Sequence, residues 1–134
     1  MDMRLEMVVI PVTDVDGAKA FYEQVGFNVD VDHRAGDFRV VQVTPPGSAC
    51  SVAFGTGMPA PACPVLGLHL VVSDIEAARE ELVGRGVEVG EVWHMGPEGQ
   101  TPGPHPDRVD YGSFATLEDP DGNVWLLQEI RSRG

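Results

Sequence analysis

The sequence predicts an α+β protein built from two similar modules, each with the element order βαβββ. An internal repeat is the first observation behind this prediction. Residues 12–19 (Val-Thr-Asp-Val-Asp-Gly-Ala-Lys) recur 60 residues later at 72–79 as Val-Ser-Asp-Ile-Glu-Ala-Ala-Arg. Residues 25–29 keep the same offset of 60 against residues 85–89. A fixed internal period of this length indicates a duplicated supersecondary unit.

Each module should contain one helix, and the capping residues place its start. Thr13 is followed three positions later by Asp16, and Ser73 is followed at the same spacing by Glu76. This spacing resembles a capping box, in which a hydroxyl and an acid bind the first free amides of a helix. Apolar residues then recur at helical spacing, as expected for one buried face. They are Val15, Ala18, Phe21, Tyr22 and Val25 in the first module, and Ile75, Ala78 and Leu82 in the second.

The remaining elements should be strands, because apolar and β-branched runs alternate with turn residues. The expected strands lie at about 6–12, 27–34, 38–44 and 50–55, and then at about 66–72, 87–94, 111–118 and 124–130. One domain should therefore hold module 1 (about 1–55), a linker (about 56–65) and module 2 (about 66–134). A single helix covers only one face of each sheet, so the modules can form an open, curled mixed sheet around a shared cleft.

The second module carries an insertion before its last two strands. The turn at 46–47 matches the turn at 121–122 at an offset of 75 rather than 60, a difference of 15 residues, which lie around 95–110. Long segments rich in glycine and proline are usually lids, binding loops or disordered. Trp93 and His94 stand at its start, where their rings could stack over a planar ligand. The alternative is a mobile surface loop that the tryptophan anchors.

Composition limits the partners of this chain of 134 residues. Nine basic against 21 acidic residues give a formal net charge of −12, which repels phosphate backbones and anionic headgroups. Nucleic acid and membrane are therefore not expected as partners. The two cysteines lack a paired spacing, and no apolar run approaches the roughly 18 residues of a membrane span. These features favour a cytoplasmic protein with reduced thiols.

The repeat and two motifs resemble the vicinal oxygen chelate superfamily, which includes glyoxalase I, bleomycin-resistance proteins and extradiol dioxygenases. The motifs are Asp-Val-Asp-Gly-Ala-Lys-Ala-Phe-Tyr at 14–22, ahead of Val-Gly-Phe at 25–27, and Asp-Pro-Asp-Gly-Asn at 119–123. The resemblance covers nearly the whole chain. It implies glyoxalase-like half-barrels and a homodimer, since such proteins commonly pair modules across chains. It does not select an activity, because the superfamily includes several chemistries and pure binding proteins.

Metal enzymes of this superfamily carry one ligand on each of four strands, usually His or Gln, Glu, His and Glu. Carried onto this chain, those positions fall at Met7, Ser51, Gly67 and Leu126. A thioether, a hydroxyl, a hydrogen and an isobutyl group do not supply the N and O donors that a hard divalent ion needs. We therefore predict that the usual metal site is absent and that no cofactor is bound.

Strand alternation places His69 on the cleft side of its strand, because the even-numbered residues of 66–72 form an aliphatic face suited to the helices. An imidazole exchanges protons near neutral pH, so His69 is the candidate catalytic acid or base, or a donor to a ligand. The alternative is a structural histidine satisfied by a neighbour such as Gln128.

The same alternation and the insertion select the remaining candidates. The predicted ligand-binding residues are Met7, Val9, Phe38, Gln42, Ser51, His69, Trp93, His94, Tyr111, Leu126 and Gln128. A mostly apolar wall with a few hydrogen-bonding groups is typical of a small-molecule pocket. A second hydrophobic core would give the same pattern.

We predict a metal-free protein of the glyoxalase and bleomycin-resistance type that binds a small apolar or aromatic molecule in its cleft. Two alternatives remain open. One is a metal-independent lyase, isomerase or cyclase in which His69 is the acid or base. The other is a divalent-metal enzyme of the glyoxalase or dioxygenase type with shifted ligands, such as His94 and His105 together with His69.

Overall fold

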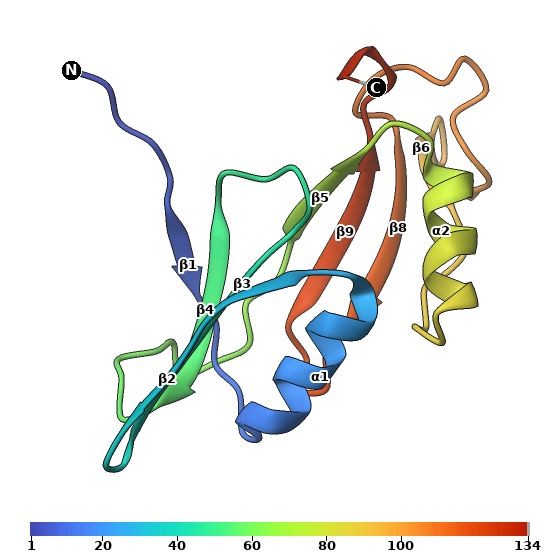
Figure 1. Ribbon diagram of the computed structural model, residues 1–134. Coiled ribbons are helices and arrows are strands. Elements are labelled where there is room, and N and C mark those ends of the chain that lie inside the picture. Colours follow the sequence, from blue (N-terminus) through green and yellow to red (C-terminus); the bar gives the residue numbers. More distant parts are fainter. Residues whose placement is uncertain (134) are drawn as a thin grey trace. The chain divides into compact units, whose positions relative to one another are not determined.

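The computed structural model describes residues 1–133 and contains two α-helices and two mixed β-sheets (Figure 1). The sheets have four and five strands, and among the described residues neither sheet closes into a barrel. The α+β architecture predicted from the repeat is confirmed. The described residues form two compact units: unit 1 comprises 1–65 and 119–123, and unit 2 comprises 66–118 and 124–133.

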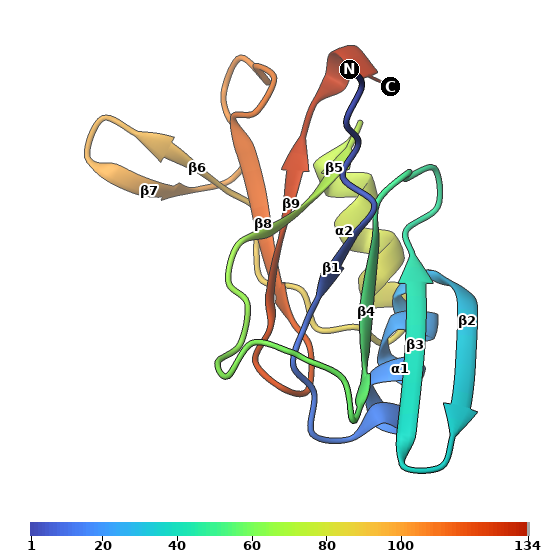
Figure 2. The ribbon, with the colours of Figure 1, turned by 90° about the vertical axis from the view of Figure 1, so that its left-hand side faces the viewer.

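Unit 1 contains one helix and a four-stranded sheet of order β1-β4-β3-β2. Its elements are β1 (Met7–Val9), α1 (Val15–Val25), β2 (Asn28–Ala35), β3 (Phe38–Thr44) and β4 (Ser51–Thr56). β1 runs parallel to β4, and the other neighbouring strands are antiparallel. Figure 2 shows α1 behind β3 and β2, where it covers one face of this sheet.

Both helices begin one residue later than the capping pattern predicts. Asp14 and Asp74 are the N-caps, and their carboxylates accept amide hydrogens from the first helical turn. Aspartate caps a helix as well as serine or threonine does, so each Thr-Asp or Ser-Asp step offered two starting points. Thr13 instead donates its hydroxyl to the Asp121 carboxylate at 2.6 Å.

The Asp-Pro-Asp-Gly-Asn turn completes the core of unit 1 through buried polar groups. The Asp119 carboxylate accepts hydrogen bonds from the Tyr22 hydroxyl at 2.7 Å and from the Asn123 amide at 2.8 Å. Asn123 also donates to the Pro11 carbonyl at 2.9 Å and accepts from the Val65 amide at 2.8 Å. Tyr22, Asp119 and Asn123 are buried, so each of these polar groups needs the partner it has.

Unit 2 contains a five-stranded sheet of order β5-β9-β8-β6-β7, and α2 packs on β8 and β9. Its elements are β5 (Leu68–Val72), α2 (Ile75–Gly84), β6 (Trp93–Gly96), β7 (Gly99–Pro102), β8 (Ser113–Glu118), β9 (Val124–Glu129) and the 3₁₀ helix η1 (Arg131–Arg133). β5 runs parallel to β9, and the other pairs are antiparallel.

The strand expected at 87–94 is wrong, because residues 87–92 are not in a strand and β6 begins at Trp93. Part of this segment is bound by a side chain of α2 instead. The Arg79 guanidinium donates to the carbonyls of Gly90 at 2.8 Å and Val89 at 3.2 Å. These contacts attach residues 89 and 90 to α2, and the Gly90 amide donates to the Thr116 carbonyl of β8 at 2.9 Å.

The inserted segment is more regular than a loop. Its first part forms a hairpin of β6 and β7, which Figure 2 shows projecting from the rest of its sheet. β5 also starts later than predicted, at Leu68 instead of 66, because Gly67 has a φ of +82°, outside the strand region.

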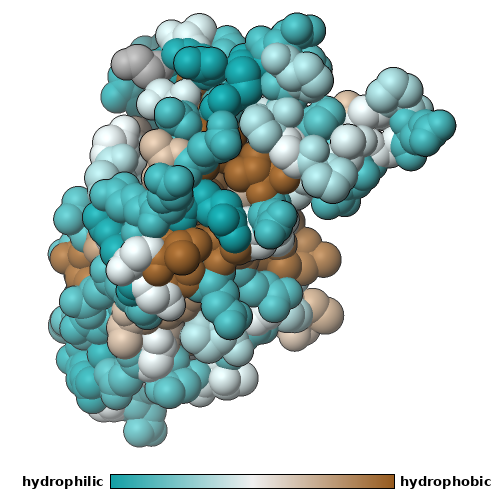
Figure 3. Space-filling model, turned by 90° about the vertical axis from the view of Figure 1, so that its right-hand side faces the viewer, coloured by the Kyte–Doolittle hydropathy of each residue, from teal (hydrophilic) through white to brown (hydrophobic). Residues whose placement is uncertain are grey.

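The surface agrees with the acidic composition. Figure 3 shows a face on which hydrophilic residues predominate and hydrophobic residues emerge in separate patches. No helix within residues 1–133 is long and apolar enough to span a membrane.

Candidate functional site

The open face of the five-stranded sheet, on the side away from α2, carries His69, Leu126 and Gln128. In β9 the residues at 125, 127 and 129 are buried, whereas Leu126 and Gln128 are half-buried. The register places His69 beside Leu126, and Val71 beside Gln128. Since alternate side chains of a strand share a face, His69 and Gln128 lie on the same face of neighbouring strands.

An aromatic pair continues this open face toward the hairpin. Phe114 of β8 pairs with Gln128 on one side and with Trp93 on the other. The Trp93 and Phe114 rings stack at a centroid distance of 4.7 Å and an interplanar angle of 24°. Beside them is a hollow of about 470 Å³, lined by Trp93, Gln100, Pro102, Thr116 and residues 90–92. Its volume is within the usual range for a small-molecule site.

Two polar side chains of this face, His69 on the edge strand β5 and Gln128 on β9, each contact a backbone carbonyl. Nδ1 of His69 lies 2.5 Å from the Gly67 carbonyl oxygen. Nε2 of Gln128 donates to the Tyr111 carbonyl at 3.2 Å. The residue that binds one ring nitrogen of His69 is therefore Gly67 and not Gln128.

Unit 1 presents its own open face, on the side of its sheet away from α1. The register places Met7 beside Ser51, Val9 beside Ala53, and Ala53 beside Gln42. These side chains therefore share one face across three strands. Phe38 lies at the start of β3 on the same side, by alternation with Gln42.

Exposure differs strongly along this face of unit 1. Met7 is 39% exposed and Phe38 is 37% exposed, so both can contact a ligand. Ser51 is only 4% exposed, and its hydroxyl oxygen lies 2.6 Å from that of Thr44. Ser51 is thus the least accessible of the residues predicted for this face.

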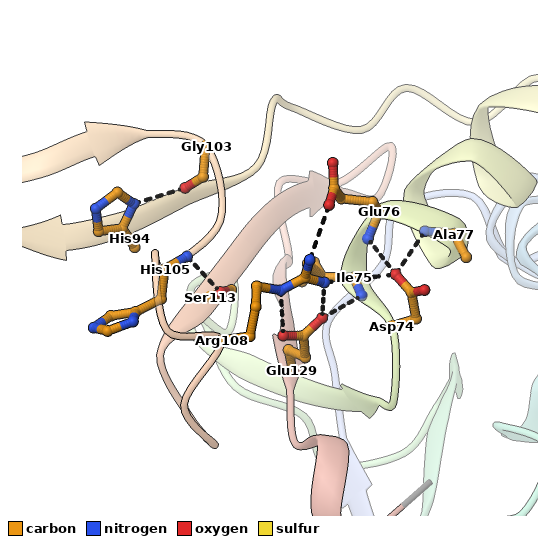
Figure 4. A network of polar contacts seen from close by, with 10 residues as sticks. All are labelled: Asp74, Ile75, Glu76, Ala77, His94, Gly103, His105, Arg108, Ser113 and Glu129. Atoms are coloured by element: carbon orange, nitrogen blue, oxygen red, sulfur yellow. Dashed lines mark hydrogen bonds and ion pairs between the residues drawn. The ribbon is translucent and has the colours of Figure 1, made fainter.

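A buried ion pair in unit 2 was missed by the sequence analysis. Arg108 donates to both carboxylate oxygens of Glu129, from Nε at 2.9 Å and from Nη2 at 2.5 Å. Glu129 is fully buried and also accepts the Ile75 amide at 2.9 Å. Figure 4 shows Arg108 between Glu129 and Glu76. Its Nη1 also donates to the Glu76 carboxylate at 3.0 Å. The hydrogen bonds from Arg108 hold the pKa of Glu129 below its usual range, although burial opposes them.

This ion pair fixes the second half of the insertion and, with it, Tyr111. Arg108 and Tyr111 both have positive φ values, +50° and +68°. The Tyr111 amide donates to the Glu129 carbonyl at 2.8 Å, and its hydroxyl accepts from Arg133 at 3.2 Å. A solitary arginine in an acidic, glycine-rich insertion was the available sequence signal, but no local pattern identified its partner.

The family to which this arrangement belongs follows from comparison with known proteins. The model of the Glyoxalase/Bleomycin resistance protein/Dioxygenase superfamily matches residues 4–127. The chain belongs to this superfamily.

Three known proteins are similar to this chain over nearly its whole length. TnmS3, an antibiotic binding protein from Streptomyces sp. CB03234, is 32% identical, with 96% of each chain covered and a TM-score of 0.72. A superfamily member from Sphaerobacter thermophilus DSM 20745 is 28% identical over 96% of this chain and 98% of its own, with a TM-score of 0.70. The uncharacterized protein YetH of Bacillus subtilis (strain 168) is 28% identical over 96% of this chain and its own full length.

The four positions that hold metal in enzymes of the superfamily do not fit a metal here. Met7 and Ser51 are neighbours on β1 and β4, and together offer a thioether and a hydroxyl that already contacts Thr44. Gly67 has no side chain, and its φ of +82° would strain any other residue. Leu126 is aliphatic. This set lacks the nitrogen and oxygen donors of a hard divalent site.

Shifted ligands are not brought together either. The rings of His94 and His105 are close, with centroids 5.7 Å apart (Figure 4). His94 is buried on the face opposite its neighbour Trp93 and binds the Gly103 carbonyl through Nδ1 at 2.7 Å. β9 and β8 separate the strand of His69 from the strand of His94. Within residues 1–133 no three His, Cys, Asp or Glu side chains are grouped to hold a metal ion.

Proposed function

We propose that this superfamily member binds a small apolar or aromatic molecule without a metal ion. The main support is the open face of the five-stranded sheet, where Trp93 stacks on Phe114 and lines a hollow of about 470 Å³. Aromatic faces bury a large area at low entropic cost, and a few oriented polar groups add selectivity. The description of TnmS3 as an antibiotic binding protein supports binding in preference to turnover.

Indole provides a direct test of this site. The chain has two tryptophans, of which Trp125 is buried and Trp93 is half-buried. In a ¹H–¹⁵N NMR titration we expect the Trp93 indole signal to shift saturably while the Trp125 signal stays in place. Trp93→Ala should weaken indole binding about tenfold, or about 1.4 kcal/mol. Unchanged affinity in Trp93→Ala would refute this location for the site.

The metal-free part of the proposal is supported by the donor chemistry at Met7, Ser51, Gly67 and Leu126. Elemental analysis of the purified protein should find Zn, Ni, Mn and Fe far below one equivalent. Indole affinity should also be unchanged by EDTA. A near-stoichiometric metal that EDTA removes together with binding would favour the metal-enzyme alternative.

A homodimer is the assembly that we propose for this chain. Residues 1–6 precede β1 and alternate between apolar and charged side chains. Met1, Met3 and Leu5 are 108%, 85% and 69% exposed, an apolar edge that a second copy would cover. Sedimentation should give a dimer for the full chain and a monomer for Met3→Asp/Leu5→Asp. A monomeric wild type would refute this assembly.

A further inference from the structure

We infer that the molecule bound on the open face of the five-stranded sheet is an aromatic hydrogen-bond donor, such as a phenol or an N–H heterocycle. This inference rests on the binding function proposed above and adds the chemical class of the ligand. Its basis is the direction of two hydrogen bonds, those of His69 and Gln128. Each side chain uses a donor on the protein, which leaves an acceptor for the ligand.

The tautomer of His69 follows from its partner. A carbonyl oxygen only accepts hydrogen bonds, so Nδ1 must donate to the Gly67 carbonyl, 2.5 Å away. A neutral imidazole with its hydrogen on Nδ1 has a lone pair on Nε2. His69 is exposed on this face, so the acceptor is accessible to a ligand.

The amide of Gln128 is oriented by the same logic. Its Nε2 donates to the Tyr111 carbonyl at 3.2 Å. A flipped amide would set Oε1 against another acceptor oxygen, which is unfavourable. The Tyr111 backbone cannot easily give way, because its own amide donates to the Glu129 carbonyl at 2.8 Å. Oε1 of Gln128 is therefore the group turned away from Tyr111 and available as an acceptor.

The surroundings make these acceptors selective. Leu126 and Val71 are the strand neighbours of His69 and Gln128, and the Trp93–Phe114 pair continues the face. An apolar ligand without donors would leave unpaired any acceptor that it covers, which costs binding free energy. Thr116, the polar neighbour of Leu126, has a hydroxyl that can donate or accept.

The net charge of the protein also favours ligands that donate hydrogen bonds. The formal net charge of −12 disfavours anionic ligands, which are also rich in acceptors. Neutral or cationic aromatic molecules with N–H or O–H groups satisfy both the hydrogen-bond directions and the charge.

Indole and benzofuran are a matched pair of probes, because benzofuran replaces the ring N–H with an oxygen at the same size. In NMR titrations of the full chain we expect indole to bind about three- to tenfold more tightly than benzofuran, the effect of the one hydrogen bond that the indole N–H can donate to either acceptor. In His69→Leu/Gln128→Leu the preference should fall to about one, with benzofuran binding no weaker than in the wild type. Gln24→Leu, an exposed change on α1 in the other unit, is the matched control and should keep the preference.

The outcomes separate this inference from the proposed function. Equal binding of the two probes at Trp93, or tighter binding of benzofuran, would overturn the donor inference and leave the binding site in place. A preference for indole that survives in His69→Leu/Gln128→Leu would overturn the assignment of these two acceptors. If neither probe shifts the Trp93 signal, the proposed site is wrong and this inference fails with it.

Discussion

The two units repeat one pattern but fill the space under their helices differently. At the turn offset of 75, Phe54 of β4 corresponds to Glu129 of β9, and both are fully buried. The aromatic ring in unit 1 needs no polar partner. The carboxylate in unit 2 takes Arg108 from the insertion and the Ile75 amide from α2. A buried charge is tolerated only when it is paired, so the extra residues of unit 2 supply what its core requires.

The second difference is how each helix binds the segment that follows it. Lys19 of α1 donates to the Asp32 side chain at 2.9 Å, and the strand that carries Asp32 pairs with β3 along its length. Arg79, which is 60 residues later, donates instead to backbone carbonyls at 89 and 90. A guanidinium presents five donors in a rigid planar fork that fits two neighbouring carbonyls, whereas the three donors of an ammonium are not fixed in such a fork. A hollow of about 700 Å³ remains beside these residues, between α2 and β8.

Removing Arg108, the charged partner of Glu129 in unit 2, should have the largest effect on stability. Arg108→Met leaves Glu129 buried without its charged partner, and we expect it to lower the free energy of unfolding by about 3 kcal/mol in urea titrations. The double variant Arg108→Met/Glu129→Phe copies the arrangement of unit 1 and should recover much of the loss. Arg85→Met, which removes an exposed pair with Glu81, is the control and should cost less than about 0.5 kcal/mol. No recovery in the double variant would contradict the equivalence with Phe54.

Acid should weaken the Arg108–Glu129 ion pair, which is the feature that distinguishes the core of unit 2 from that of unit 1. The pKa of Glu129 is lower in the folded protein than its usual value, chiefly through Arg108. The stabilisation from this shift is therefore complete above the pKa of the unfolded chain and is lost as pH falls through the folded pKa. We expect the stability advantage of wild type over Glu129→Gln to be constant near neutral pH and to shrink on acidification below about pH 4.5. Asp32, whose pKa Arg39 lowers in unit 1, is unchanged in this comparison and cancels. An advantage that does not depend on pH would show that the carboxylate charge is not involved.

Replacing Arg79 with lysine, the residue at the equivalent position of unit 1, should have a smaller effect on stability. Arg79→Lys removes the forked contact with the two carbonyls, and we expect a loss of about 1 kcal/mol. Hydrogen exchange of the Gly90 amide should become faster, because its segment is then less restrained. Lys19→Arg serves as the reciprocal variant and should change stability little. Unchanged exchange at Gly90 would indicate that Arg79 does not hold this segment.

Local sequence patterns predicted part of the candidate site, whereas contacts between separate strands determined the rest. Alternation along the strands was sufficient to group His69, Leu126 and Gln128 on one face, because successive residues of a strand must point to opposite sides. It did not predict that Trp93 stacks on Phe114, since this requires the register of β6 against β8. Nor did it show that Gly67 and Tyr111 supply the carbonyls that orient the polar groups.

The sequence by itself determined the α+β class, the duplication, the two helices and the faces of most strands. These features depend on repeats, capping residues and periodicity, which act over a few neighbouring residues. Only the tertiary structure decided that the insertion begins as a hairpin, that residues 87–92 leave the sheet, and that Arg108 pairs with Glu129. Each of these outcomes depends on which donors and acceptors the folded chain brings within hydrogen-bond distance.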